Sequence, residues 1–218
     1  MTVATILVLA KEPLPGRVKT RLCPPCSPAD AAAIAAVALE TTLRTVANVV
    51  GVRRVLVLDG APGPWLPDGF EVVPQVSGDL GDRLAGAFAV ASTGPTVLVG
   101  MDTPHLDSTR LRGVVDALLE PCVDAVLGLT TDGGWWTIGV RDPALPVFAG
   151  VPMSTTTTGG RQRERLVELE LRTELVGSET DVDDFASACF VASLMPNTEF
   201  SAVVGRIHAH VVSNGTPP

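Results

Sequence analysis

Cysteines and long apolar runs are scarce in this sequence, and each shortage excludes a class of protein. Four cysteines in 218 residues are too few for a disulfide scaffold. The longest apolar run near the N-terminus, VATILVLA, has the length of a buried strand, whereas about twenty apolar residues are needed to cross a bilayer. No basic segment precedes this run and no cleavage site follows it, as a secretory signal would require. We therefore expect a cytoplasmic protein without a membrane span.

Basic residues are also in the minority, which argues against a nucleic-acid partner. Lysine and arginine together number 16 against 24 acidic residues, which gives a formal net charge of −8 and a pI near 4.8. Binding to a nucleic-acid backbone needs a broad basic surface, although a local cluster of cations can still hold a small anionic ligand. The apolar fraction of 46% predicts a substantial buried core.

Apolar runs of strand length alternate with helical stretches along the chain. This alternation predicts an α/β protein with a mostly parallel sheet covered by helices. We expect residues 1–195 to form one domain and residues 196–218 to be a weakly patterned tail. Ser27, followed by Pro28, is the predicted N-cap of the longest helix. The expected strands cover residues 2–10, 53–59, 70–75, 95–102, 124–129, 135–140 and 172–177, and the expected helices cover residues 27–50, 78–92, 107–119, 160–170 and 183–193.

Both lysines of the chain lie in one loop, AKEPLPGRVKTRL, directly after the first expected strand. Ligands of open α/β sheets bind beyond the carboxyl ends of the strands, which is where this loop lies. The loop carries four cations, Lys11, Arg17, Lys19 and Arg21, and Gly16 lets its backbone bend close to a ligand. In an extended loop, Arg17, Lys19 and Arg21 lie on one side. The pattern predicts phosphate binding, and the alternative is a solvated basic loop paired with surplus acid.

Carboxylates follow two other expected strands. Asp102 ends the strand in LVGMDTPHL, where a carboxylate suits Mg²⁺ or Mn²⁺ bridging to nucleotide phosphates. The alternative role, capping the next helix, can be filled by Asp107 or Ser108. After the last expected strand, TDVDD supplies Asp181 and Asp183, one of which is a candidate second metal ligand while the other can cap the final helix. We assign the metal to Asp102 and Asp183.

The stretch TDGGWW holds three further candidates. Asp132 lies beside two glycines and can accept hydrogen bonds from a sugar or an acceptor. The alternative is a hairpin turn built on Asp-Gly chemistry. Trp135 and Trp136 lie on opposite faces of the expected strand, so one is expected in the core while the other can stack on a base or sugar.

The glycine-rich start of the helix at GDLGDR is a candidate nucleotide contact. Gly78, Asp79 and Arg83 can approach a ligand at this helix N-terminus. The charges of Asp79 and Asp82 oppose a phosphate there, so we expect contact with a base or sugar.

His105 and the pair Cys23 and Cys26 carry weaker patterns. His105 follows the Asp102 motif and can act as an acid or base, although a lone histidine is more often structural. Cys23 and Cys26 have a redox-type C-P-P-C spacing. Since no second pair completes a zinc site, the alternative is two small apolar residues in a loop.

Five stretches resemble, in order and spacing, a bacterial family described as glycosyltransferases and also catalogued as "transferase 1, rSAM/selenodomain-associated". They are AKEPLPGRVKTRL, GDLGDRLAGAF, VLVGMDTPHL, DAVLGLTTDGGWWTIGV and TDVDDF. The resemblance covers about residues 3–193. It implies the GT-A fold of the nucleotide-diphospho-sugar transferases, a three-layer sandwich with a mostly parallel mixed sheet, and a single nucleotide-binding domain. It also implies nucleotide binding at the carboxyl edge, with Asp102 at the place of the metal-binding aspartate.

The sequence departs from that family in three places. The usual Asp-Val-Asp-Thr-Pro-Glu-Asp is DVDDF at residues 181–185, which weakens any role beyond Asp183. A Trp-Ser-Thr motif is Met-Ser-Thr at residues 153–155, and the usual tyrosines are Trp135 and Trp136. We therefore expect a different acceptor side.

Three functional readings stay open, with Asp102, Lys19 and Asp132 as the expected catalytic residues of either enzyme. In glycosyl transfer, Mg²⁺ or Mn²⁺ at Asp102 neutralises the leaving nucleoside diphosphate while a small-molecule acceptor attacks the sugar. In nucleotidyl transfer, a phosphorylated substrate attacks a nucleoside triphosphate and the basic loop, which looks like that of the phospholactate guanylyltransferases, stabilises pyrophosphate. The family resemblance favours the first reading and the basic loop favours the second, and we take glycosyl transfer to an unknown acceptor as the main expectation. The third is a nucleotide-binding protein without catalysis.

Overall fold

Seven strands form one mixed sheet in the computed structural model, which describes residues 4–213. Their order across the sheet is β3-β2-β1-β4-β6-β5-β7. Only β6 runs antiparallel to its neighbours, and the other pairs are parallel. The predicted α/β fold with a mostly parallel mixed sheet is confirmed. The strands are β1 (Ala4–Lys11), β2 (Val52–Asp59), β3 (Glu71–Pro74), β4 (Thr96–Val99), β5 (Ala125–Leu129), β6 (Trp135–Val140) and β7 (Thr173–Leu175), and residues 2 and 3 of the first predicted strand lie outside the described residues.

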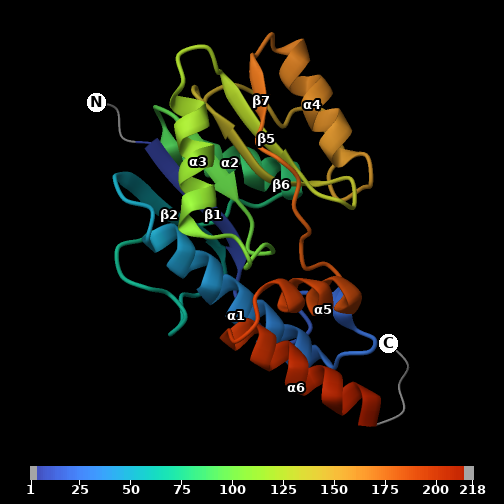
Figure 1. The fold of residues 1–218 in the computed structure, drawn as a ribbon. Helices are drawn as coiled ribbons and strands as arrows, with labels where there is room; N and C mark the ends of the chain where they lie inside the picture. The colour runs from blue at the N-terminus through green and yellow to red at the C-terminus, as the bar shows by residue number, and fades with distance from the viewer. Residues whose placement is uncertain (1–3, 214–218) are drawn as a thin grey trace.

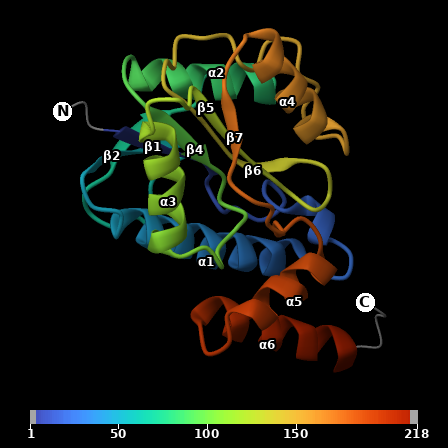
Figure 2. The ribbon, with the colours of Figure 1, turned by 45° about the horizontal axis from the view of Figure 1, so that its top comes forward.

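The helices cover both faces of the sheet, with α1 and α3 on one face and α2 and α4 on the other (Figures 1 and 2). Ser27 caps α1 as predicted, because its hydroxyl accepts from the Asp30 backbone while the Asp30 carboxylate accepts from Ser27. No helix within residues 4–213 is long and apolar enough to cross a bilayer. The helices are α1 (Pro28–Ala47), α2 (Leu80–Ala91), α3 (Ser108–Leu119), α4 (Thr158–Glu168), α5 (Phe185–Leu194) and α6 (Glu199–Ser213), with a short 3₁₀ helix η1 (Thr20–Leu22).

The core lies on both faces of β1, because successive side chains of a strand point to opposite sides. Ile6 and Val8 pack with α1 and α3 on one face, and Leu7 packs with Leu84 and Phe88 of α2 on the other. All five side chains are almost fully buried. This explains why the first strand reads as a continuous apolar run, and it fixes the carboxyl end of β1 at the middle of the sheet edge.

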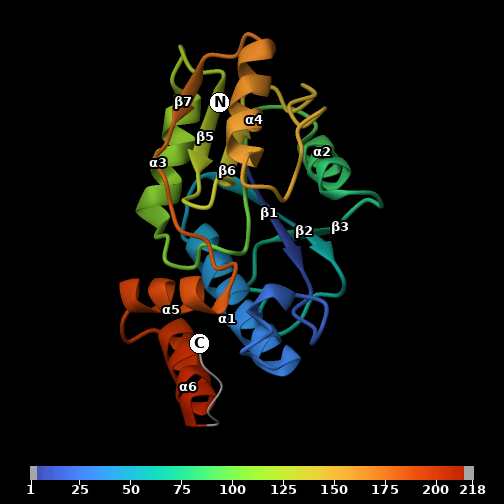
Figure 3. The ribbon, with the colours of Figure 1, turned by 90° about the vertical axis from the view of Figure 1, so that its right-hand side faces the viewer.

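The chain beyond residue 195 differs from the expected weakly patterned tail. It contains α6, which packs against α1 and α5 (Figure 3). Phe200, Val204, Ile207 and Val211 form its buried stripe at helical spacing. Apolar residues also lie on the exposed face, which obscures the period in the sequence. Residues 214–218 of the predicted tail lie outside the described residues.

We expect Phe200→Ala to destabilise the protein, because Phe200 is fully buried between α6 and its neighbours. Removing a buried phenyl ring costs about 3–5 kcal/mol. At about 2–4 °C per kcal/mol for a chain of this size, the melting temperature should fall by about 6–20 °C. Circular dichroism during heating would measure the change. Val212→Ala, at a position 58% exposed on the same helix, is the control and should leave the melting temperature nearly unchanged.

Candidate active site

Two adjoining cavities lie at the sheet edge where the parallel strands end. The first, of about 670 Å³, is here called the acidic cavity, and the second, of about 440 Å³, the basic cavity. Because several residues line both, the cavities are two halves of one cleft. The shared residues are Leu9, Arg21, Leu80, Asp102, Ser154 and Asp183.

The basic cavity gathers the four predicted loop cations and Arg83 of α2. The expectation that the loop is extended is wrong, since Lys19 has a left-handed backbone with φ 48° and η1 follows it directly. A left-handed residue before a helical turn compacts the chain here. Arg17, Lys19 and Arg21 nevertheless line the same cavity.

Three of the loop cations pair with acidic residues from other segments. Arg17 lies 3.6 Å from Asp59, and the Arg21 guanidinium lies 2.6 Å from Asp183, which raises the pKa of Arg21. The Lys19 ammonium contacts the Asp102 carboxylate and donates to the Val182 carbonyl. The loop is therefore both paired with acid and open to a ligand, because the Arg17 and Arg21 side chains are about 60% exposed.

Gly16, Gly78 and Asp79 are not among the residues that line the basic cavity. Gly16 and Gly78 have positive φ values of 76° and 124° in turns. Asp79 is the N-cap of α2 in a reciprocal box with Asp82. The structure thus gives these three residues turn and capping contacts, while Arg83 of the same motif reaches the cavity.

Gln75 is a lining residue that the sequence did not single out. Its amide nitrogen donates to the carbonyls of Ala10 and Val57, at 2.7 and 3.2 Å, and its amide oxygen lies 3.4 Å from Arg83. Gln75 thereby links the ends of β1 and β2, and its amide oxygen faces Arg83, which lines the same cavity. It follows an apolar strand directly, which is the one signal the sequence contains.

The acidic cavity brings Asp102, Asp132 and Asp181 together from the ends of three strands. Burial, and then the charges of Asp132 and Asp102, raise the pKa of Asp181 to about 6. Asp183 instead faces Arg21. The alternative that Asp181 or Asp183 caps the final helix is wrong, because Asp184 is the N-cap of α5.

Asp132 combines both roles considered for it. One carboxylate oxygen, Oδ1, accepts from the Gly134 backbone at 3.0 Å and from the Thr130 hydroxyl, as a turn residue would. The residue also lines the cavity. Its position depends on Gly133, where φ is 93° and a Cβ atom would lie 1.9 Å from the Thr156 carbonyl oxygen.

That close approach docks the turn on a hydroxyl-rich segment before α4. The Gly159 backbone donates to Gly133 at 2.8 Å and fixes the contact. As a result Ser154, Thr155, Thr156 and Thr158 line the cavity beside Asp132, while the Thr158 hydroxyl donates to the Pro152 carbonyl. Ser154 and Thr155 belong to the Met-Ser-Thr motif that the sequence related to the acceptor side, whereas Thr156 and Thr158 were not predicted as part of the site.

The two tryptophans lie on opposite faces, as predicted. Trp136 is 3% exposed in the core, and its indole donates to the Gly177 carbonyl at 3.2 Å. Trp135 lies near Phe148, with ring centroids 6.3 Å apart and planes 26° apart. Both residues also line the acidic cavity.

The candidates with weaker sequence patterns, His105, Cys23 and Cys26, do not line either cavity. The His105 side chain is 10% exposed and its Nε2 lies 3.1 Å from Glu179. Cys23 and Cys26 are free, and burial raises the pKa of Cys26 to about 11, so its thiol is protonated at neutral pH. Within residues 4–213, no three His, Cys, Asp or Glu side chains already lie close enough to hold a metal ion by themselves.

Comparisons with known proteins connect this chain to one family and one fold. A family model described as "Uncharacterized protein conserved in bacteria (DUF2064)" matches residues 42–155. A solved protein from Desulfovibrio desulfuricans G20, described provisionally as a nucleotide-diphospho-sugar transferase, superposes with a TM-score of 0.86 at 23% identity and 98% coverage of both chains. No curated protein matches the sequence.

Two more distant solved structures share the fold. CMP:2-keto-3-deoxy-manno-octonic acid synthetase, complexed with CTP, superposes with a TM-score of 0.58 at 13% identity. The match covers 89% of this chain and 98% of the synthetase chain. Rv0371c from Mycobacterium tuberculosis H37Rv, complexed with manganese, has a TM-score of 0.50 at 22% identity, with coverages of 87% and 97%.

We expect Asp181→Asn to stabilise the metal-free protein near pH 7. The pKa of Asp181 is raised above its usual value of 3.8, so its ionisation in the folded state costs stability. That stability is fully present below about pH 4 and is lost as the pH rises through about 6. The variant should therefore match the wild type at pH 4 and exceed it by up to about 3 kcal/mol at pH 7. Urea unfolding in EDTA across this range measures the difference, and equal pH profiles would contradict the assignment.

Proposed function

The chain belongs to the bacterial family described as DUF2064, and from its cleft we propose that it is a nucleotide-utilising transferase that moves a glycosyl group from a nucleotide-diphospho-sugar to an unphosphorylated acceptor. The description of the family names no reaction. The proposal is therefore argued from the charges and hydroxyl groups of the cleft, with the shared fold of transferases as support.

The division of charge along the cleft carries the proposal. The basic cavity is lined by five cations and two carboxylates, which suits a diphosphate. The acidic cavity is lined by four carboxylates, while its one cation within the described residues, Arg21, lies on the boundary. Carboxylates, hydroxyl groups and an indole suit the hydroxyls and apolar faces of a sugar. A phosphorylated acceptor would meet repulsion there.

The basic cavity and the acidic cavity then have different roles in the reaction. Lys11, Arg17, Lys19 and Arg21 bind the diphosphate and stabilise the charge that develops on it as it leaves. Asp132 receives the proton of the acceptor hydroxyl, because its second oxygen, Oδ2, is not used by the hydrogen bonds of the turn.

The donor set of the acidic cavity fits a hard divalent ion. Asp102 and Asp181 present carboxylate oxygens, the ligands that Mg²⁺ and Mn²⁺ prefer. Burial raises the pKa of Asp181 first, and the charges of Asp132 and Asp102, which a cation would offset, raise it further. We propose Asp181 in the place expected for Asp183, since Asp183 pairs with Arg21 while Asp181 forms no ion pair within residues 4–213. At Asp102 the ion would share the carboxylate with Lys19. When bound, the ion would add positive charge beside the diphosphate.

Nucleotidyl transfer is the second candidate. It is supported by the basic loop and by the shared fold of the synthetase complexed with CTP. That reaction needs a second anionic substrate beside the α-phosphate, and the acidic cavity disfavours such a substrate.

Thermal unfolding with a panel of nucleotide sugars and nucleoside triphosphates tests the proposal, each ligand with and without Mg²⁺. A ligand at 100 times its dissociation constant stabilises by about 2.7 kcal/mol, so we expect a rise of about 5–10 °C for one nucleotide sugar with metal. A larger shift with a triphosphate than with any nucleotide sugar would favour nucleotidyl transfer instead.

We expect the double variant Lys19→Ala with Arg21→Ala to weaken binding of that donor by at least about 100-fold, because each cation supplies a charge-assisted contact worth about 1.5–3 kcal/mol. Isothermal titration calorimetry measures the affinity. Arg44→Ala with Arg112→Ala is the matched control, since both arginines form exposed helix ion pairs outside the cleft. Unchanged affinity in the first variant would contradict the phosphate assignment.

A further inference from the structure

Glu179 lies outside both cavities but is hydrogen-bonded at its backbone to the end of β5. Its N–H donates to the Leu129 carbonyl at 3.0 Å, and its carbonyl accepts from the Thr131 backbone at 3.1 Å. These bonds extend the pairing of β5 with the segment that follows β7. They fix Glu179 beside the turn of Asp132 and two residues before Asp181.

The side chain of Glu179 reaches a third segment, the one that follows β4. Its Oε2 lies 3.1 Å from Nε2 of His105, which is three residues after Asp102. The other ring nitrogen of His105, Nδ1, is buried without a hydrogen-bond partner among the described residues. The orientation of the imidazole is therefore set by Glu179.

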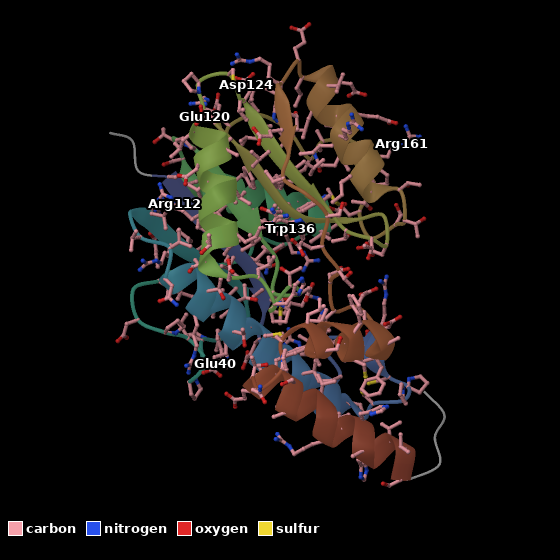
Figure 4. The ribbon with its side chains drawn as sticks, in the orientation of Figure 1. Glu40, Arg112, Glu120, Asp124, Trp136 and Arg161 are labelled. Carbon is pink, nitrogen blue, oxygen red and sulfur yellow. The ribbon has the colours of Figure 1, made fainter. Side chains whose placement is uncertain are left out.

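Arg110 of α3 holds the second oxygen of Glu179. Its Nε and Nη2 atoms lie 3.2 and 3.1 Å from Oε1. The guanidinium also lies 5.6 Å from the centroid of the Trp136 ring, whose indole donates to Gly177. Figure 4 labels Trp136 near the middle of the sheet. At 18% exposure, the Glu179 carboxylate is thus fixed from two sides.

We propose that Glu179 is a positioning residue that holds Asp102, Asp132 and Asp181 together in the acidic cavity. Three carboxylates that share a half-buried site repel one another, and a shift of any one segment would relieve the repulsion. Glu179 is bonded to all three segments, so it opposes that shift. This inference rests on the proposed function, in which the acidic cavity binds the ion and the acceptor.

Two substitutions separate positioning from simple loss of packing. Glu179→Ala removes both side-chain contacts. Glu179→Gln keeps the contact with Arg110, because its amide oxygen still accepts from the guanidinium. Its NH₂ can donate to His105 only when the imidazole proton is on Nδ1, which has no partner among the described residues, so this contact is weakened. We expect Glu179→Ala to lower kcat and Mn²⁺ affinity by about 10–100-fold, with the KM for the donor within about twofold, and Glu179→Gln to lower both less. Kinetics and electron paramagnetic resonance of free Mn²⁺ measure these quantities.

Asp124→Ala is the matched control. Asp124 pairs with Arg172 at 2.7 Å and joins the same two strands, β5 and β7, at their opposite ends. Figure 4 shows Asp124 far from Trp136 along the sheet. The control loses an ion pair of the same kind and should keep kcat and Mn²⁺ affinity.

Carbon-13 NMR of the aspartate carboxyl groups tests the inference whichever reaction the protein catalyses. The signals of Asp102, Asp132 and Asp181 should move in Glu179→Ala, move less in Glu179→Gln and stay near their wild-type positions in Asp124→Ala. Unmoved signals in Glu179→Ala, or a Glu179→Gln variant as impaired as Glu179→Ala, would overturn the positioning role. A wild type that binds neither Mn²⁺ nor a nucleotide sugar would instead overturn the proposed function, and the NMR comparison would still decide the role of Glu179.

Discussion

The Lys19 ammonium is the contact on which the cleft depends. It contacts the Asp102 carboxylate after β4 and the Val182 carbonyl before α5, while Lys19 itself follows β1. The Val182 N–H in turn donates to the Asp102 carbonyl at 2.8 Å. With a side chain only 10% exposed, Lys19 joins three segments that are far apart in the sequence. An arginine would not be equivalent, because a compact ammonium fits between a carboxylate and a carbonyl where a planar fork would need more room.

The acidic half of the cleft depends on close backbone packing as much as on charge. The turn that carries Asp132 can approach the threonine-rich segment only because Gly133 has no side chain, and Gly159 completes the contact from the start of α4. The contact places serine and threonine residues beside the carboxylates that line the acidic cavity. Glu179, which lies outside the cavity, pairs with His105 and Arg110.

Much of the fold could be predicted from local patterns. The alternation of strands and helices, the Ser27 cap and the opposite faces of Trp135 and Trp136 all follow from side-chain periodicity and capping chemistry. The loop cations were found from their unusual concentration after a buried strand. The helix α6 was missed because apolar residues on its exposed face obscure the period, and the compact form of the basic loop was missed because it is held by contacts with distant residues. Gln75, Thr156, Thr158 and Glu179 have no pattern of their own and become lining or supporting residues only through their neighbours.

The sequence by itself determined most of the segments that become strands and helices, and that cations and carboxylates would meet where the strands end, because burial and periodicity act along the chain. The tertiary structure alone decided how the charges divide. Arg21 pairs with Asp183, while Asp181 turns toward Asp102 and Asp132, although the two aspartates are two residues apart. That choice depends on the distance between side chains from different strands. Electrostatic interactions depend on separation in space and on burial, which local sequence patterns do not specify.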